Sequence, residues 1–283
     1  MAEITSYYRP ESIAEAVELL SQPHVPATVL SGGAVKLAAD GAAFEAVIDV
    51  QVIPSLVEIS TGADGGLLVG ASVSLETLVR DERTPALLRE ILTRSLTWNR
   101  RNGVSLGEAV EYPTEFPELM AALLALDVTL TFAVPGEHRV KLVDLGRDLA
   151  QPKLPRHGLM TLAELPPAGP WQTWGTACVA RTPRDQAIVS VSAVLVTDET
   201  GHVVTARLAL TGVWAGPACI AVTASAALSG LPLDDAAIEM TAAKVQAEVT
   251  PVADYLGSAA YRRAMVGILT RRALAACRAR LTS

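Results

Sequence analysis

Two short glycine turns decide the fold of this chain: Leu30-Ser31-Gly32-Gly33-Ala34, and later Asn102-Gly103-Val104-Ser105-Leu106-Gly107-Glu108. The apolar residues Ala27–Leu30 predict a short strand that enters the first turn. Pro117–Leu126 predicts a helix after the second turn. Glycine lets a backbone approach another group very closely, because no Cβ stands in the way. By themselves, the two turns are typical of tight connections between a strand and a helix.

Signals on either side of the first turn predict a small α/β unit followed by a hairpin. Ser12 stands before the apolar positions that begin at Ile13, so we expect it to be a helix N-cap, with Glu15 in the capping-box position. Ala63-Asp64-Gly65 predicts a hairpin turn. The expected strands are Ala46–Val50, Leu56–Ile59 and Gly66–Gly70, and the expected helices are Ser74–Arg80 and Pro85–Leu96.

The sequence changes character at a proline-rich passage. Five prolines between Pro152 and Pro170 predict an extended crossing segment or linker. After it, Gln186–Val196 and His202–Val213 flank Asp198-Glu199-Thr200-Gly201 and predict a second hairpin. The other expected elements are a strand at Val128–Ala133 and helices at Ala218–Leu228, Asp234–Val249 and Tyr261–Leu281. The pattern predicts an α+β chain with a break near residue 175.

Composition and charge exclude several classes of function. The chain has 283 residues, half of them hydrophobic, which is enough for two domains with real cores. A net charge of −7 and only 4% aromatic residues argue against nucleic-acid binding. The longest apolar run, Leu119–Val134, is interrupted by Asp127, so we expect no membrane span. Met1–Arg9 has no signal-peptide pattern, and we expect a cytoplasmic location.

The chain carries no recognisable catalytic or metal-ligating motif of its own. The cysteines, Cys178, Cys219 and Cys277, are isolated from one another, and the four histidines are scattered. Neither a Gly-x-Ser-x-Gly elbow nor a Walker-type loop occurs. We therefore expect no metal site and no catalytic residue, and any chemistry comes from a bound organic cofactor or from a partner.

The order of these signals resembles the flavin-binding (medium) subunit of the molybdenum-containing hydroxylases, the xanthine dehydrogenase and carbon monoxide dehydrogenase family. Leu30-Ser31-Gly32-Gly33 stands where that family has an Ala-Gly-Gly-Thr turn, and Ser105-Leu106-Gly107 stands within its Thr-Ile-Gly-Gly-Asn turn. The further matching positions, in chain order, are Tyr8-Arg9-Pro10, Ile13–Ala16, Val69–Val73, Arg101-Asn102, Leu123–Asp127, Arg181, Ala187–Ser190, Arg207, Gly212-Val213, Pro217 and Tyr261-Arg262-Arg263.

The resemblance implies a two-subdomain, PCMH-like flavin-binding fold over residues 1–175, with subdomains of about 1–55 and 56–175. A small α+β C-terminal domain with a short antiparallel sheet and helices follows over residues 176–283. It implies an oxidoreductase subunit that binds FAD and passes electrons to an acceptor. The implied partners are a molybdopterin-binding large subunit and a [2Fe–2S] small subunit.

The resemblance also implies which residues hold the flavin. In the family, one glycine turn comes from each subdomain, and backbone N–H groups of the two turns meet the diphosphate. The implied FAD-binding residues are Leu30, Ser31, Gly32, Gly33, Ala34, Gly70, Ala71, Ser105, Leu106, Gly107 and Glu118.

Both turns depart from the family pattern, so a second function stays open. Ala34 replaces a threonine, Glu108 replaces the second glycine, and Ala109 replaces an asparagine. A Glu108 carboxylate about 4 Å from a diphosphate costs roughly 4 kcal/mol at an effective dielectric constant of about 20. Lys36 offers a counter-charge, either to phosphate or to Glu108 across an empty site. The alternative is a flavin-free structural or assembly homologue whose diphosphate site is lost.

Arginines are frequent along the last expected helix. They are compatible with a basic binding face or, as the simpler interpretation, with a solvated helix face. The residues are Arg262, Arg263, Arg271, Arg272, Arg278 and Arg280.

Overall fold

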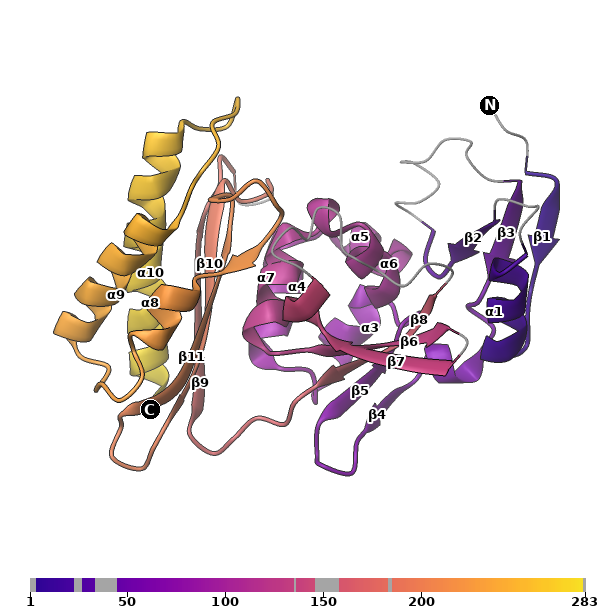
Figure 1. Ribbon diagram of the computed structural model, residues 1–283, viewed down its shortest axis with the longest axis horizontal. Coiled ribbons are helices and arrows are strands. Elements are labelled where there is room, and N and C mark those ends of the chain that lie inside the picture. The colour runs from indigo at the N-terminus through magenta and orange to yellow at the C-terminus, as the bar shows by residue number, and fades with distance from the viewer. Residues whose placement is uncertain are drawn as a thin grey trace.

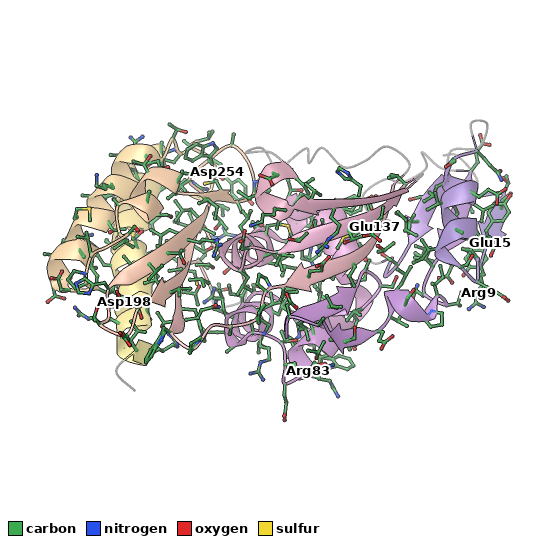
Figure 2. All side chains as sticks on the ribbon, turned by 60° about the horizontal axis from the view of Figure 1, so that its bottom comes forward. Arg9, Glu15, Arg83, Glu137, Asp198 and Asp254 are labelled. Carbon is green, nitrogen blue, oxygen red and sulfur yellow. The ribbon has the colours of Figure 1, made fainter. Side chains whose placement is uncertain are left out.

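The computed structural model describes residues 4–22, 27–33, 45–134, 136–145, 158–182 and 185–281. Its strands form three sheets, which follow one another along the long axis of the molecule (Figure 1). Figure 2 shows Arg9 and Glu15 at the end formed by the N-terminal unit, and Asp198 among the strands and helices toward the opposite end. The α+β class predicted from the sequence is confirmed.

The N-terminal unit is a three-stranded parallel sheet with one helix. The strand order is β1 (Ser6–Tyr8), β3 (Ala46–Asp49), β2 (Ala27–Leu30), and the helix is α1 (Ile13–Leu20). The predicted N-cap is confirmed, because the Ser12 hydroxyl accepts the Glu15 N–H. The Glu15 carboxylate reaches back to the Glu11 N–H, one residue before the cap. A small core around Ala16 and Ile48 holds the helix on the sheet.

The middle unit is a five-stranded antiparallel sheet covered by short helices. The strand order is β4 (Ile59–Thr61), β5 (Leu67–Gly70), β8 (Leu159–Leu165), β6 (Thr129–Val134), β7 (Gly136–Lys141). The helices are α3 (Leu75–Arg80), α4 (Ala86–Ser95), α5 (Trp98–Gly103), α6 (Leu106–Glu111) and α7 (Pro117–Ala125), with 3₁₀ turns η1 (Pro54–Leu56), η2 (Pro113–Glu115) and η3 (Leu142–Leu145).

The C-terminal unit is a four-stranded antiparallel sheet with helices on one face. The strand order is β12 (Cys219–Ile220), β11 (Val203–Thr211), β10 (Val189–Thr197), β9 (Gln172–Val179). The helices are α8 (Val222–Ala226), α9 (Asp235–Glu248) and α10 (Ala259–Leu281). The predicted hairpin around Asp198–Gly201 is confirmed as β10 and β11.

Helix α7 joins the middle and C-terminal units. Its nine residues are all buried, as expected of a helix that is apolar on nearly every side. Val194 of β10 and Ala209 of β11 belong to the same apolar core as α7 and the middle sheet. In Figure 1, α7 lies between the C-terminal sheet and the other helices of the middle unit. The two units therefore share a core.

Three element predictions are corrected by the structure. Leu56 belongs to the 3₁₀ turn η1 that Pro54 begins, and the strand follows at Ile59–Thr61. The proline-rich passage contains β8, a central strand that pairs with both β5 and β6. The segment predicted as one helix from Ala218 begins with the strand β12, and α8 follows at Val222.

Residue 175, where the sequence places a domain boundary, lies inside β9. Gln172 at the start of β9 already pairs with Val196 of β10. We propose that the C-terminal unit begins at the start of this strand rather than at residue 176.

Candidate functional site

The structure brings the two glycine turns together. The first turn leaves β2 and the second forms the N-terminus of α6. The Ser31 and Ser105 hydroxyls are hydrogen-bonded at 2.8 Å, although the residues are 74 apart in the chain. The Gly33 N–H donates to Oε2 of Glu108 at 3.0 Å. We call the space framed by Ser31–Gly33 and Ser105–Glu108 the cradle.

Gly32 is the point where the two turns touch. A Cβ on Gly32 would lie 2.7 Å from the Ser105 nitrogen, which is closer than real Cβ atoms come to other atoms, and 3.0 Å from the Gly103 oxygen, which is a tight contact. Gly33 beside it has a φ of 95°, a left-handed conformation that favours glycine. Close contact between the turns therefore accounts for this glycine pair without any ligand.

Backbone N–H groups at the start of α6 are already used within the chain. Leu106 N–H donates to the Val73 oxygen at 2.9 Å, and Gly107 N–H donates to the Ala71 oxygen at 2.8 Å. A Cβ on Gly107 would lie 3.0 Å from that same Ala71 oxygen, so the glycine serves this contact. These two donors are therefore committed to holding α6 against the end of β5.

The next two N–H groups of α6 cap the helix itself. Ser105 is the N-cap, and its hydroxyl accepts the Glu108 N–H at 3.2 Å. The Ala109 N–H donates to the Ser105 carbonyl oxygen at 3.0 Å. With Leu106 and Gly107, the first four N–H groups of α6 all have acceptors inside the protein, so none points unpaired into the cradle.

Glu108 fills the cradle from the α6 side. Its side chain is only 2% exposed. Oε2 lies 2.5 Å from the position that a Gly32 Cβ would take and accepts the Gly33 N–H. A buried carboxylate needs such donors because burial removes its hydration. The carboxylate oxygen therefore stands against the glycine pair, where a phosphate oxygen is expected from the resemblance.

Gly70 and Ala71, predicted as a secondary flavin contact, have backbone roles at the end of β5. The Gly70 N–H donates to the Glu58 oxygen, and a Cβ on Gly70 would collide with the Leu56 oxygen. Ala71 donates to the Thr161 oxygen at 3.0 Å and accepts from Gly107. Both residues thus position α6 relative to the sheet.

Glu118 lies at the start of α7, where its carboxylate is bound by Arg94. Glu118 is 5% exposed, and its Oε1 accepts from Nη2 of Arg94 at 2.9 Å. Arg94 is the last basic residue of α4, and no sequence signal connected it to Glu118. The ion pair holds α4 and α7 together, and Glu118 lines two cavities beside it.

The larger cavity has a volume of about 340 Å³ and opens between α4 and the end of β9. That volume is at the lower limit for small-molecule pockets. Arg94, Glu118, Cys178 and Arg181 are among its lining residues. Burial raises the pKa of the Cys178 thiol, so the thiol is protonated at neutral pH and is no activated nucleophile. A smaller cavity of about 110 Å³ adjoins it at Ser95 and Glu118.

The remaining predicted site residues divide into two groups. Leu30 is half-buried at the end of β2, and its oxygen accepts the Val50 N–H at 3.1 Å. Ala34 and Lys36 lie outside the described residues, and with them the predicted pairing of Lys36 with Glu108.

The cradle as it stands does not fit the diphosphate of FAD. A diphosphate needs free N–H donors and no competing anion. Here the Gly33 N–H is taken by Glu108, the first N–H groups of α6 are taken within the chain, and a carboxylate occupies the space.

The described part of the chain holds no cluster of three or more His, Cys, Asp or Glu side chains that could bind a metal ion. No helix there is both long and apolar enough to cross a membrane.

Two domain families match this chain. The FAD binding domain in molybdopterin dehydrogenase matches residues 2–168, and the CO dehydrogenase flavoprotein C-terminal domain matches residues 177–277. The first match alone covers more than half of the chain. Both matches agree with the units seen in the fold.

Known relatives match over nearly their whole length. The carbon monoxide dehydrogenase medium chain of Afipia carboxidovorans is 29% identical over 292 residues, covering 97% of this chain and 96% of the relative. The uncharacterized protein YgfM of Escherichia coli K12 is 29% identical over 275 residues, with the same coverage.

Solved structures match equally far. A chain of the carbon monoxide dehydrogenase from Hydrogenophaga pseudoflava, in a form lacking the Mo-pyranopterin moiety of the molybdenum cofactor, superposes with a TM-score of 0.89 at 27% identity. The match covers 99% of both chains. A chain of quinoline 2-oxidoreductase from Pseudomonas putida 86 has a TM-score of 0.87. This chain therefore belongs to the FAD-binding, medium-subunit family of the molybdenum hydroxylases.

Proposed function

We propose that this chain is the medium subunit of a multi-subunit, molybdenum hydroxylase-type oxidoreductase. Its partners in this proposal are a molybdopterin-binding large subunit and a [2Fe–2S] small subunit. Support comes from relatives that are medium chains and match this chain from end to end. A cytoplasmic location is part of the same proposal.

Within that complex, the geometry best supports a structural role without bound FAD. One observation carries this choice: the buried Glu108 carboxylate accepts the Gly33 N–H inside the cradle. Close contacts to backbone also account for Gly32 and Gly107 without a ligand, which supports this choice. The chain then contributes its surface and its shape to the complex.

Electron transfer through FAD is the second candidate, and the match to the FAD binding domain in molybdopterin dehydrogenase favours it. The matching FAD binding domain implies that the residues predicted from the turns would hold the cofactor. In this candidate, Glu108 must leave the cradle before FAD can bind.

Purification from the native host under gentle conditions tests the subunit role. An affinity-tagged chain is expected to elute with two further chains, and the complex is expected to contain molybdenum and iron in fixed ratio. A tagged chain that elutes alone from every fraction, while the molybdenum and iron elute elsewhere, contradicts the proposal. The metal analysis is independent of whether FAD is present.

A further inference from the structure

We infer that the Glu108 carboxylate is a built-in substitute for phosphate, and that this one side chain excludes dinucleotides from the cradle. The inference rests on the proposed function only in taking the cradle as the family's diphosphate site. It concerns the isolated chain, so it does not depend on the partner subunits.

The Glu108 carboxylate lies directly beside Gly32 and Gly33. Oε2 of Glu108 is 3.0 Å from the Gly33 nitrogen and 2.5 Å from the position of a Gly32 Cβ. This oxygen thus lies directly against the glycine pair. An anion that approaches Gly32 and Gly33 meets Glu108 first.

Glu108 is held both at its backbone and at its carboxylate. Ser105 accepts the Glu108 N–H at 3.2 Å, and the carboxylate accepts the Gly33 N–H. Glu108 also lies in the first turn of α6, where the N-terminus of a helix attracts a negative charge. The residue is 2% exposed, so movement into solvent would require the turns to separate. The carboxylate is therefore a fixed occupant of the cradle.

Carboxylate and phosphate oxygens accept the same N–H donors, which explains why one can replace the other. The carboxylate differs because it cannot leave, and its charge repels an incoming diphosphate. A like charge about 4 Å away lowers affinity roughly a thousandfold at an effective dielectric constant of about 20. Occupation of the space adds to this repulsion.

The experiment compares FAD binding by the purified full-length chain and its Glu108 variants. Quenching of FAD fluorescence gives the affinity, and melting temperature with and without FAD gives an independent readout. E108A and E108G are expected to bind FAD at least about a hundredfold more tightly than the unaltered chain. Riboflavin, which carries no phosphate, is expected to gain nothing. E111A, at an exposed position of the same helix, is the matched control and is expected to behave as the unaltered chain.

E108Q separates charge from occupation. It removes the charge, but its amide oxygen can still accept the Gly33 N–H, so we expect E108Q to bind FAD more tightly than the unaltered chain and less tightly than E108A. The inference is overturned if the unaltered chain binds FAD saturably, or if folded E108A and E108G do not bind it. It is also overturned if E108Q binds as tightly as E108A, because charge alone would then be the barrier. None of these outcomes depends on the partner subunits.

Discussion

Gly32 and Glu108 together decide the state of the cradle. The missing Cβ of Gly32 lets Ser31 and Ser105 come within hydrogen-bonding distance, and it leaves room for the Glu108 carboxylate. Side chain and backbone from opposite turns thus satisfy each other, which is why the site can be closed without a change of fold.

Substitution of Gly32 by alanine tests this contact. The new Cβ would collide with the Ser105 nitrogen and the Glu108 carboxylate, so the free energy of unfolding is expected to fall by about 1–3 kcal/mol. Denaturant titration measures the change. Gly169→Ala is the matched control, because a Cβ there meets no atom within 4 Å, and it is expected to be nearly neutral. Equal stability of the two variants would show that the turns do not touch.

Among the elements, the helices of the middle unit are held by buried ion pairs. Arg101 of α5 donates to Oε2 of Glu76 in α3 at 2.7 Å and to the Leu96 oxygen at 2.7 Å. Arg80 binds the other Glu76 oxygen at 3.0 Å. Because Arg101 directly precedes the second turn, this pair fixes where the turn begins. Hydrogen bonds from Arg101, then from Arg80, hold the pKa of Glu76 below its usual 4.5.

A lowered pKa makes stability depend on pH in a defined direction. The contribution of ionised Glu76 is fully present above pH 4.5 and is lost as the pH falls below that value through the lower folded-state pKa. E76Q is therefore expected to be less stable at pH 7 and to lose less stability between pH 4.5 and more acid conditions. Thermal melts across this range measure both effects. An unchanged acid dependence in E76Q would contradict the assignment.

The arginines of α10 show how an element joins its unit. The interpretation of a solvated face is wrong for Arg262, which is 4% exposed and donates to the Ile188 and Gly212 oxygens and to Asp254. Three of the other arginines contact neighbouring elements. Arg271 donates to Glu239 and Arg278 donates to Asp235, both in α9, and the Arg280 guanidinium stacks on Trp174 of β9. Most of these arginines therefore bind groups within the C-terminal unit, and Arg280 also lies 3.8 Å from Glu90 of α4 in the middle unit.

Local signals explain which elements could be predicted from the sequence. The capped helix α1, the hairpin of β10 and β11 and the long helix α10 follow from caps, turns and periodicity within each segment. Strand β8 could not be predicted this way. It lies among prolines, and it is a strand because β5 and β6, distant in the chain, pair with both of its edges.

Some features of the candidate site could be predicted from the sequence, and others depend on the folded chain. The two turns and the conflict at Glu108 are visible in the sequence, since they are local departures from a family pattern. The bond between Ser31 and Ser105 and the pairing of Arg94 with Glu118 join segments that only the folded chain brings together. The sequence left two functions open, and the buried position of the carboxylate favours one of them.

Across the whole molecule, apolar packing between elements joins the units. The shared core around α7 joins the middle and C-terminal units, and α1 packs the N-terminal unit against the middle sheet. In the proposed flavin-free role, this packing keeps the shape by which the chain assembles with its partners.

Flavin content of the protein purified from its native host tests this account most directly. Acid or heat releases any FAD that is bound without a covalent link, and the fluorescence of the supernatant is compared with the amount of protein. The account predicts a colourless protein that releases no flavin and shows no saturable quenching when FAD is added. One FAD released per chain would contradict it and would mean that Glu108 leaves the cradle when the cofactor binds.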